Sequence, residues 1–122
     1  MNVIHENFPK SKRHQDAVYY AINQLKDYPL TSYIEAIYLY GSCARGEEKW
    51  NSDVDLCIIL KESVKMVPKY SPLMHTMKGI LSDDKIDSVE VDAKIFIGDE
   101  WKTSKTLFCE NLRKDGKIIW QR

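Results

Sequence analysis

The sequence lacks the features that mark secreted, membrane-bound and strongly charged proteins. Its first ten residues contain no apolar stretch of the kind found in signal peptides, and no run of about eighteen apolar residues predicts a membrane helix. Lysine plus arginine number 18 and aspartate plus glutamate number 18, so the formal net charge is zero. No overall field therefore favours nucleic acid or an anionic membrane, and we expect a cytoplasmic protein whose charged groups act locally.

Cysteine and histidine are also scarce. The three cysteines are widely spaced and form no C-x-x-C pair, which argues against a disulfide framework or a zinc knuckle. The three histidines are equally scattered, so we expect them to be surface or packing residues and not metal ligands. These residues are Cys43, Cys57, Cys109, His5, His14 and His75.

The 122 residues, 43% of them hydrophobic, are enough for one domain with a substantial core, and we expect residues 1–122 to form it. Helical spacing of apolar residues predicts an amphipathic helix over 12–27, with a solvated basic start that includes Arg13. Runs of β-branched and aromatic residues predict strands over 34–40 and 53–60. The second run is almost wholly apolar, which indicates a central strand.

The second half of the chain continues the alternation of helices and strands. Ser71-Pro72 predicts a helix start, with an apolar stripe that extends to about Leu81, and residues 89–97 alternate as a strand with one wet face. A last helix is expected after a cap at Thr103 or Ser104, before a short strand over 117–120. The fold class is therefore α/β, a mixed β-sheet packed with helices.

The segment from Gly41 to Asp55 carries the clearest chemical pattern. A glycine followed by Ser42 at the end of a strand permits a sharp turn, where backbone N–H groups and the hydroxyl can hold phosphate oxygens. Asp53 and Asp55 are two residues apart on a predicted strand, so both carboxylates project to the same side. Two such carboxylates repel each other unless a cation lies between them, and magnesium is commonly held by one or two carboxylates together with substrate phosphates.

A third carboxylate, Asp92, lies on the wet face of another predicted strand and joins the pair if the two strands are neighbours. Three acids can support two metal ions, one at the attacking oxygen and one at the leaving pyrophosphate. Each feature also has an ordinary structural explanation: a Gly-Ser turn, a solvated strand end, an exposed acid, or an ion pair of Arg45 with a neighbouring glutamate. A Walker A loop is excluded, because Glu47 and Glu48 occupy the positions of its Lys and Ser/Thr.

The spacing closely resembles the signature of the DNA polymerase β-like nucleotidyltransferase superfamily, and specifically of its minimal nucleotidyltransferases. The similarity extends to the preceding strand, to Asp92 and to the closing segment from Phe108 to Arg113. The signature consists of Gly41-Ser42, ten intervening residues that include Ala44-Arg45-Gly46 and end in Ser52, and then Asp53-x-Asp55.

The resemblance implies a Mg²⁺-dependent nucleotidyltransferase that moves a nucleotide, AMP from ATP, to a hydroxyl group. It implies that Gly41 and Ser42 bind the triphosphate, with Arg45 and Ser52 in supporting nucleotide-binding roles. It further implies two Mg²⁺ ions held by three catalytic acids, Asp53, Asp55 and Asp92. Asp92 is the candidate base.

The resemblance also suggests a partner. Minimal nucleotidyltransferases are often antitoxins that silence a helical HEPN toxin by adding AMP to a tyrosine, and too few residues follow position 100 to form an acceptor-binding domain of this chain's own. One alternative is a catalytically silent module that masks its partner, with Tyr19, Tyr20 and Trp101 as candidate anchors. Another is transfer to a small molecule, with the acceptor site formed in a homo-oligomer. Neutral charge argues against a nucleic-acid acceptor.

Overall fold

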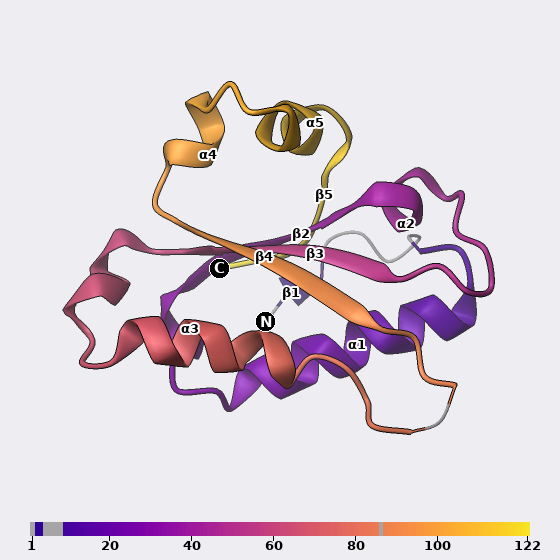
Figure 1. The fold of residues 1–122 in the computed structure, drawn as a ribbon, viewed down its shortest axis with the longest axis horizontal. Helices are drawn as coiled ribbons and strands as arrows, with labels where there is room; N and C mark the ends of the chain where they lie inside the picture. The colour runs from indigo at the N-terminus through magenta and orange to yellow at the C-terminus, as the bar shows by residue number, and fades with distance from the viewer. Residues whose placement is uncertain (1, 4–8, 86) are drawn as a thin grey trace.

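We describe the fold from a computed structural model, which describes residues 2–3, 9–85 and 87–122. Within these ranges the strands form one mixed sheet of five strands in the order β1-β5-β2-β3-β4 (Figure 1). Neighbouring strands are antiparallel except β3 and β4, which are parallel. The strands are β1 (Asn2–Val3), β2 (Ile34–Tyr40), β3 (Val54–Leu60), β4 (Val91–Ile97) and β5 (Lys117–Gln121).

Helices lie on both sides of this sheet. Figure 1 shows α1 and α3 on one side and α4 and α5 on the other, with α2 at the end of β2. None of the helices in the described ranges combines the length and hydropathy that a membrane crossing requires. The α-helices are α1 (Lys12–Lys26), α2 (Gly41–Arg45), α3 (Tyr70–Gly79), α4 (Glu100–Thr103) and α5 (Leu107–Asp115), and the short 3-10 helices are η1 (Thr31–Tyr33) and η2 (Glu62–Met66).

The two faces of the sheet are packed differently. Strand residues such as Leu39, Leu56 and Ile58 point to the α1 and α3 side and belong to the large aliphatic core. Their neighbours in the chain, including Cys57, point to the α4 and α5 side, where a smaller cluster contains Trp101 and several partly exposed aromatic rings. Since successive strand residues face opposite sides, each central strand builds a full core on one side and a partly open surface on the other.

The first three long predicted elements are confirmed: the helix over 12–27 and the strands over 34–40 and 53–60 match α1, β2 and β3. The central position of β3 is also confirmed, because it pairs with β2 on one side and with β4 on the other. Each match has the same cause. The apolar period of each segment matches the surface that it buries.

Two predicted helix starts are wrong. The helix α3 begins at Tyr70 after Lys69, whose φ of 61° reverses the chain, so Ser71 lies inside the first turn and is not the cap. The predicted last helix is two helices, because the backbone at Ser104 is extended, and Thr106 caps α5 by accepting a hydrogen bond from the Cys109 N–H. The segment directly after β3 contains the short 3-10 helix η2.

Candidate functional site

The predicted site lies where three strand ends meet. Strand β2 runs toward this edge of the sheet and ends at Tyr40, while β3 and β4 begin there (Figure 1). In the β-ladder Tyr40 is opposite Asp55, and Asp55 is opposite Asp92. Residues opposite each other in a ladder point to the same face, so the parallel pairing of β3 and β4 brings together two acids that are 37 positions apart in the printed sequence.

Gly41 forms the turn from β2 into α2. Its φ of 74° lies in the left-handed region that favours glycine, and a Cβ at this position would be 2.7 Å from Oδ2 of Asp55. The absence of a side chain therefore has two consequences: the chain can turn, and the Asp55 carboxylate can approach the turn. This contact links the glycine of the predicted phosphate turn to the acids.

The surroundings of Asp55 disfavour the charged form of its carboxyl group. Burial raises the pKa of its carboxyl group above the ordinary value, and the negative charges of Asp92 and Asp53 raise it further. None of the ion pairs formed within the described ranges involves these three acids. The carboxylates repel one another without a basic partner among the described residues, which is the electrostatic condition that a bound cation relieves.

The donor set fits magnesium by its chemistry, since carboxylate oxygens are the ligands that this hard cation prefers. Over the described residues, however, no group of three or more aspartate, glutamate, histidine or cysteine side chains lies in an arrangement that could hold a metal ion. The three acids thus share one edge of the sheet without forming a closed cage. Mg²⁺ retains water and phosphate ligands, so it does not need a cage made only of protein groups.

Asp53 lies one residue before β3, in the loop that follows α2, and its side chain is exposed. The preceding residue, Ser52, closes a turn by accepting a hydrogen bond from the Lys49 N–H at 2.9 Å. The backbone carbonyl of Asp53 is 3.5 Å from the Cys43 thiol, which donates to it. Ser52 therefore has a structural role in the loop, and its predicted contact with nucleotide stays a prediction.

A cavity of about 280 Å³ adjoins the Gly41 turn on the α5 side of the sheet. Two aromatic rings that meet edge to face, Tyr40 and Phe108, form part of its wall, with centroids 5.0 Å apart. Arg45 also lines it and forms an ion pair with Glu47 at 3.5 Å, as one of the ordinary explanations expected. The lining residues are Tyr40, Gly41, Arg45, Phe108, Asn111, Leu112 and Asp115.

Sequence reasoning did not assign Tyr40 to the site. Its ladder partner is Asp55, so its ring faces the same side as the acids. Burial and then the charges of Asp55 and Asp92 raise the pKa of its hydroxyl. The signal in the sequence was its position directly before Gly41, at the end of a strand that was correctly predicted. Only the ladder register and the packing of α5 show that this ring borders both the cavity and the acids.

All three cysteines are buried, and none of them forms a disulfide bond with another described residue. Burial, followed by the charges of Glu48, Asp55 and Asp53, raises the pKa of the Cys43 thiol to about 12. A thiol with so high a pKa is a poor nucleophile at neutral pH, so packing is the role of Cys43. Among the histidines, His14 is fully buried and His75 is exposed, while His5 lies outside the described residues.

One candidate interface anchor is wrong. Trp101 is only 7% exposed and packs edge to face against Tyr38, with ring centroids 5.1 Å apart. It therefore belongs to the cluster beneath α4 and α5, where burial of its ring stabilises the fold. Tyr19 is 43% exposed and remains available on the surface.

The fold and the acidic edge define a class of nucleotide-transferring domains, and comparison with known proteins agrees. The family described as "Polymerase beta, Nucleotidyltransferase" matches residues 22–122. The chain belongs to this nucleotidyltransferase family. The match covers β2, β3 and β4 and every residue of the predicted site.

Among individual proteins, the chain is similar to the protein adenylyltransferase MntA of Shewanella oneidensis, with 23% identity over 87 residues. The alignment covers 71% of this chain and 54% of MntA, so the chain spans about half the length of this curated relative.

Two solved structures are also similar. A toxin-antitoxin structure with AMP-PNP has a TM-score of 0.51 at 21% identity, over 85% of this chain and 73% of that one. A candidate nucleotidyltransferase from Sulfolobus solfataricus has a TM-score of 0.48 at 21% identity, over 92% and 90%. The first of these likenesses supports the predicted fold class.

Proposed function

We propose that this chain transfers AMP from ATP to a hydroxyl group of a partner protein, and that it acts as the antitoxin of a helical HEPN toxin whose tyrosine is the acceptor. Family membership supports nucleotidyl transfer. The relative MntA is a protein adenylyltransferase, and one similar structure is a toxin-antitoxin pair with AMP-PNP, which support the acceptor class. The observation that carries the proposal is the ladder register that sets Asp55 opposite Asp92, beside the Gly41 turn.

In this proposal the nucleotide lies along the edge of the sheet. Gly41 and Ser42 contact the triphosphate, and the aromatic wall of the neighbouring cavity receives the nucleoside. Arg45 lines the same cavity and its guanidinium suits a phosphate or a ribose hydroxyl. Gly41 lines this cavity as well as forming the turn, which supports binding of one nucleotide across both.

Three acids would hold Mg²⁺: Asp53, Asp55 and Asp92. Bound Mg²⁺ supplies positive charge that offsets the carboxylates and the triphosphate as charge moves to the leaving group. The acceptor oxygen forms a bond to the α-phosphorus, the bond from that phosphorus to the bridging oxygen breaks, and pyrophosphate leaves with the bonding electrons. Asp92 is exposed on β4, the edge strand of the described sheet, so we assign it as the base that takes the proton of an incoming hydroxyl.

The test is labelling of a partner. The purified chain, Mg²⁺, α-labelled ATP and the small helical protein encoded by the neighbouring reading frame are incubated together, and the modified residue is identified by mass spectrometry. We expect label on a partner tyrosine. The double variant Asp53→Asn, Asp55→Asn should lower the labelling rate by at least about 100-fold, because it removes electrostatic stabilisation of the transition state. Asp99→Asn, an exposed acid paired with Lys102 after the far end of β4, is the matched control and should label normally.

The same double variant separates transfer from masking. If neutralisation of the toxin is lost while binding persists, transfer is the function. If neutralisation persists without label, the chain is a masking module and the proposal is wrong. Label found on a small molecule or on nucleic acid, with none on the protein partner, would instead favour a different acceptor class.

A further inference from the structure

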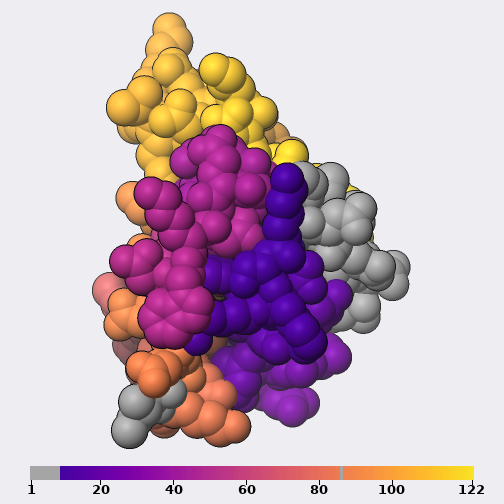
Figure 2. Space-filling view, turned by 90° about the vertical axis from the view of Figure 1, so that its right-hand side faces the viewer, coloured from indigo at the N-terminus to yellow at the C-terminus, as the bar shows by residue number. Residues whose placement is uncertain are grey.

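The loop between α2 and β3, residues 46–53, carries Asp53 but lies outside the sheet ladder. The first turn of α1 contacts this loop, although the two segments are 37 or 38 residues apart in the chain. In Figure 2 the beginning of α1 (indigo) lies against the loop (magenta) on the face that also shows the segment before β4 (orange). We call Ser11, Arg13 and His14 the α1 triplet.

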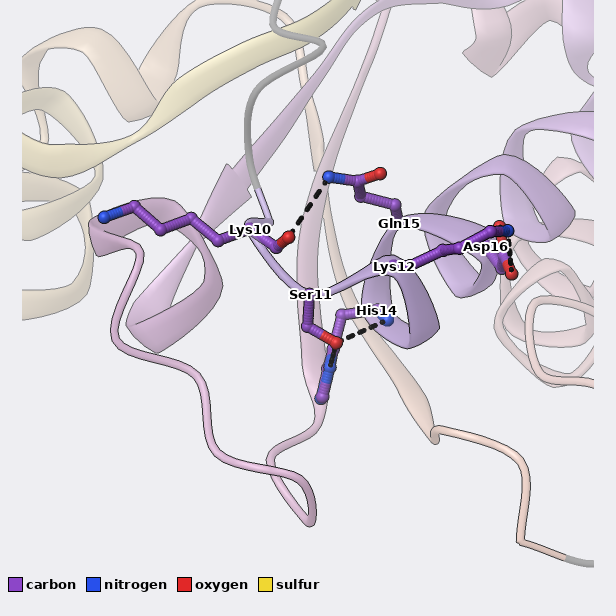
Figure 3. A network of polar contacts seen from close by, with 6 residues as sticks. All are labelled: Lys10, Ser11, Lys12, His14, Gln15 and Asp16. Atoms are coloured by element: carbon purple, nitrogen blue, oxygen red, sulfur yellow. Dashed lines mark hydrogen bonds and ion pairs between the residues drawn. The ribbon is translucent and has the colours of Figure 1, made fainter.

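His14 makes the contact that lies nearest to Asp53. Its side chain is fully buried, and Nε2 is 2.8 Å from the backbone carbonyl oxygen of Ser52, the residue directly before Asp53. A carbonyl only accepts, so Nε2 carries the hydrogen, and Nδ1 accepts from the Ser11 hydroxyl at 3.0 Å. Figure 3 shows the Ser11 and His14 side chains directed toward each other at the start of α1. Both ring nitrogens are thus used, and the ring orientation is fixed.

Arg13 contacts two segments that precede acid-bearing strands. Its Nε donates to the Trp50 carbonyl at 3.3 Å, and its guanidinium lies 4.2 Å from the centroid of the Trp50 ring. Its Nη1 also donates to the carbonyl of Asp87, in the segment that leads to β4. One side chain therefore links the approach to Asp53 with the approach to Asp92. The prediction that Arg13 belongs to a solvated basic helix start is therefore wrong.

Ser11 adds a third contact and orients the helix. Its backbone N–H donates to Oε2 of Glu48 at 2.9 Å, and its hydroxyl caps α1 by accepting from the His14 N–H. The loop is therefore held at three alternate residues: Glu48, Trp50 and Ser52. By contrast, Lys12 faces outward and pairs with Asp16 one turn along the same helix (Figure 3).

These contacts hold the loop that carries Asp53. The Asp53 carboxylate makes no hydrogen bond or ion pair with any other described residue, so the backbone of the loop determines where it lies. We propose that the α1 triplet, with His14 as its main member, is a positioning device that fixes the loop so that Asp53 presents its carboxylate to the metal. This role rests on the proposed function, because it assumes that the acids bind a divalent cation.

The first test uses electron paramagnetic resonance to measure Mn²⁺ binding by the full chain in the presence of a non-hydrolysable ATP analogue. His14→Leu keeps bulk but removes the donor to Ser52, and we expect about a tenfold rise in the Mn²⁺ dissociation constant. His14→Gln retains an N–H donor near the Nε2 position and should restore binding to within about threefold of wild type. Met77→Ala opens a cavity under α3 and lowers stability, but should leave Mn²⁺ affinity unchanged.

A second pair of variants applies even if His14→Leu does not fold. Arg13→Ala and Lys12→Ala each remove one positive charge from the same helical turn, but only Arg13 contacts the loop. We expect a weakening of about fivefold for Arg13→Ala and no change for Lys12→Ala. The role of the triplet would be overturned by wild-type affinity in both Arg13→Ala and folded His14→Leu. Equal losses of affinity in Arg13→Ala and Lys12→Ala would also overturn it. Neither result would affect the proposed function. Failure of the wild-type chain to bind Mn²⁺ would overturn the proposed function as well.

Discussion

Two neighbouring residues on β3, Asp55 and Leu56, have opposite roles because they face opposite sides of the sheet. Leu56 is fully buried in the aliphatic core under α1 and α3. Asp55 points to the side of α4 and α5, where like charges and partial burial raise the pKa of its carboxyl group. One side of the strand stabilises the fold, and the other side carries the unfavourable charges that the proposed activity requires.

The comparison extends along the whole sheet. The side under α1 and α3, the covered side, is formed by a large hydrophobic cluster that is mainly aliphatic. The side under α4 and α5, the open side, combines a smaller cluster rich in aromatic rings with Asp55, Asp92 and Lys94. Hydrophobic burial on the covered side offsets the cost of holding carboxylates close together on the other. Stability and function should therefore respond differently to substitutions that are only one residue apart.

The largest effect is expected on the covered side. Leu56→Ala removes a buried side chain and leaves a cavity, which should lower the free energy of unfolding by about 2–5 kcal/mol. Leu107→Ala is the matched control, because that leucine is 73% exposed and its loss should change stability by less than about 0.5 kcal/mol. Urea denaturation measures both. Similar losses for the two variants would contradict the division between the faces.

The next effect concerns the turn beside the acids. Gly41→Ala places a methyl group 2.7 Å from the Asp55 carboxylate at a φ of 74°, so both strain and displacement follow. We expect a loss of about 1–3 kcal/mol in stability, together with loss of Mn²⁺ binding. Gly79→Ala in α3 meets no atom within 4 Å and should be neutral or stabilising by up to about 1 kcal/mol. Normal Mn²⁺ affinity in a folded Gly41→Ala chain would show that the close approach is unimportant.

A smaller effect, an increase in stability instead of a loss, is expected when Asp55 is replaced. Its pKa is raised in the folded state, so the folded chain binds this proton more tightly than the unfolded chain does. The metal-free protein therefore loses stability as pH rises from the ordinary aspartate value through the raised one, and the loss is complete above it. Asp55→Asn removes this penalty and should raise the thermal unfolding midpoint at neutral pH by a few degrees while Mn²⁺ binding is lost. An unchanged or lower midpoint, against Asp99→Asn as control, would contradict the charge repulsion.

The sequence was sufficient to predict the elements that bring the acids together. Runs of β-branched and aromatic residues predict the strands at 34–40 and 53–60. The alternation of apolar and polar residues correctly places Asp92 on the exposed face of its strand. Whether Asp92 joins Asp55 depended on strand order. The parallel register of β3 and β4 supplies that information, and no local pattern contains it.

Other features of the site could not be predicted from local patterns. The role of Arg13 depends on Trp50 and Asp87, which are distant in the chain, and a basic residue at a helix start looks the same when it is solvated. The start of α3 was misplaced because Lys69 adopts a left-handed conformation that non-glycine residues rarely adopt. That residues 1–122 form a single domain stays a prediction. The nucleotide-binding roles of Gly41, Ser42, Arg45 and Ser52 also stay predictions.

The smallest effect is expected at the open side itself. Lys94 is exposed, faces the same side as Asp92 two residues before it, and places its ammonium group 4.5 Å from the centroid of the Phe108 ring. Lys94→Gln should cost less than about 1 kcal/mol, the range of an exposed cation–π contact, and Lys105→Gln on an exposed loop serves as the charge-matched control. Loss of the positive charge should also strengthen Mn²⁺ binding slightly, because a cation near the acids opposes a second cation. A loss of stability comparable to that of Leu56→Ala would mean that the open side is part of the core and not a surface on which acids and substrate contacts can vary at low cost.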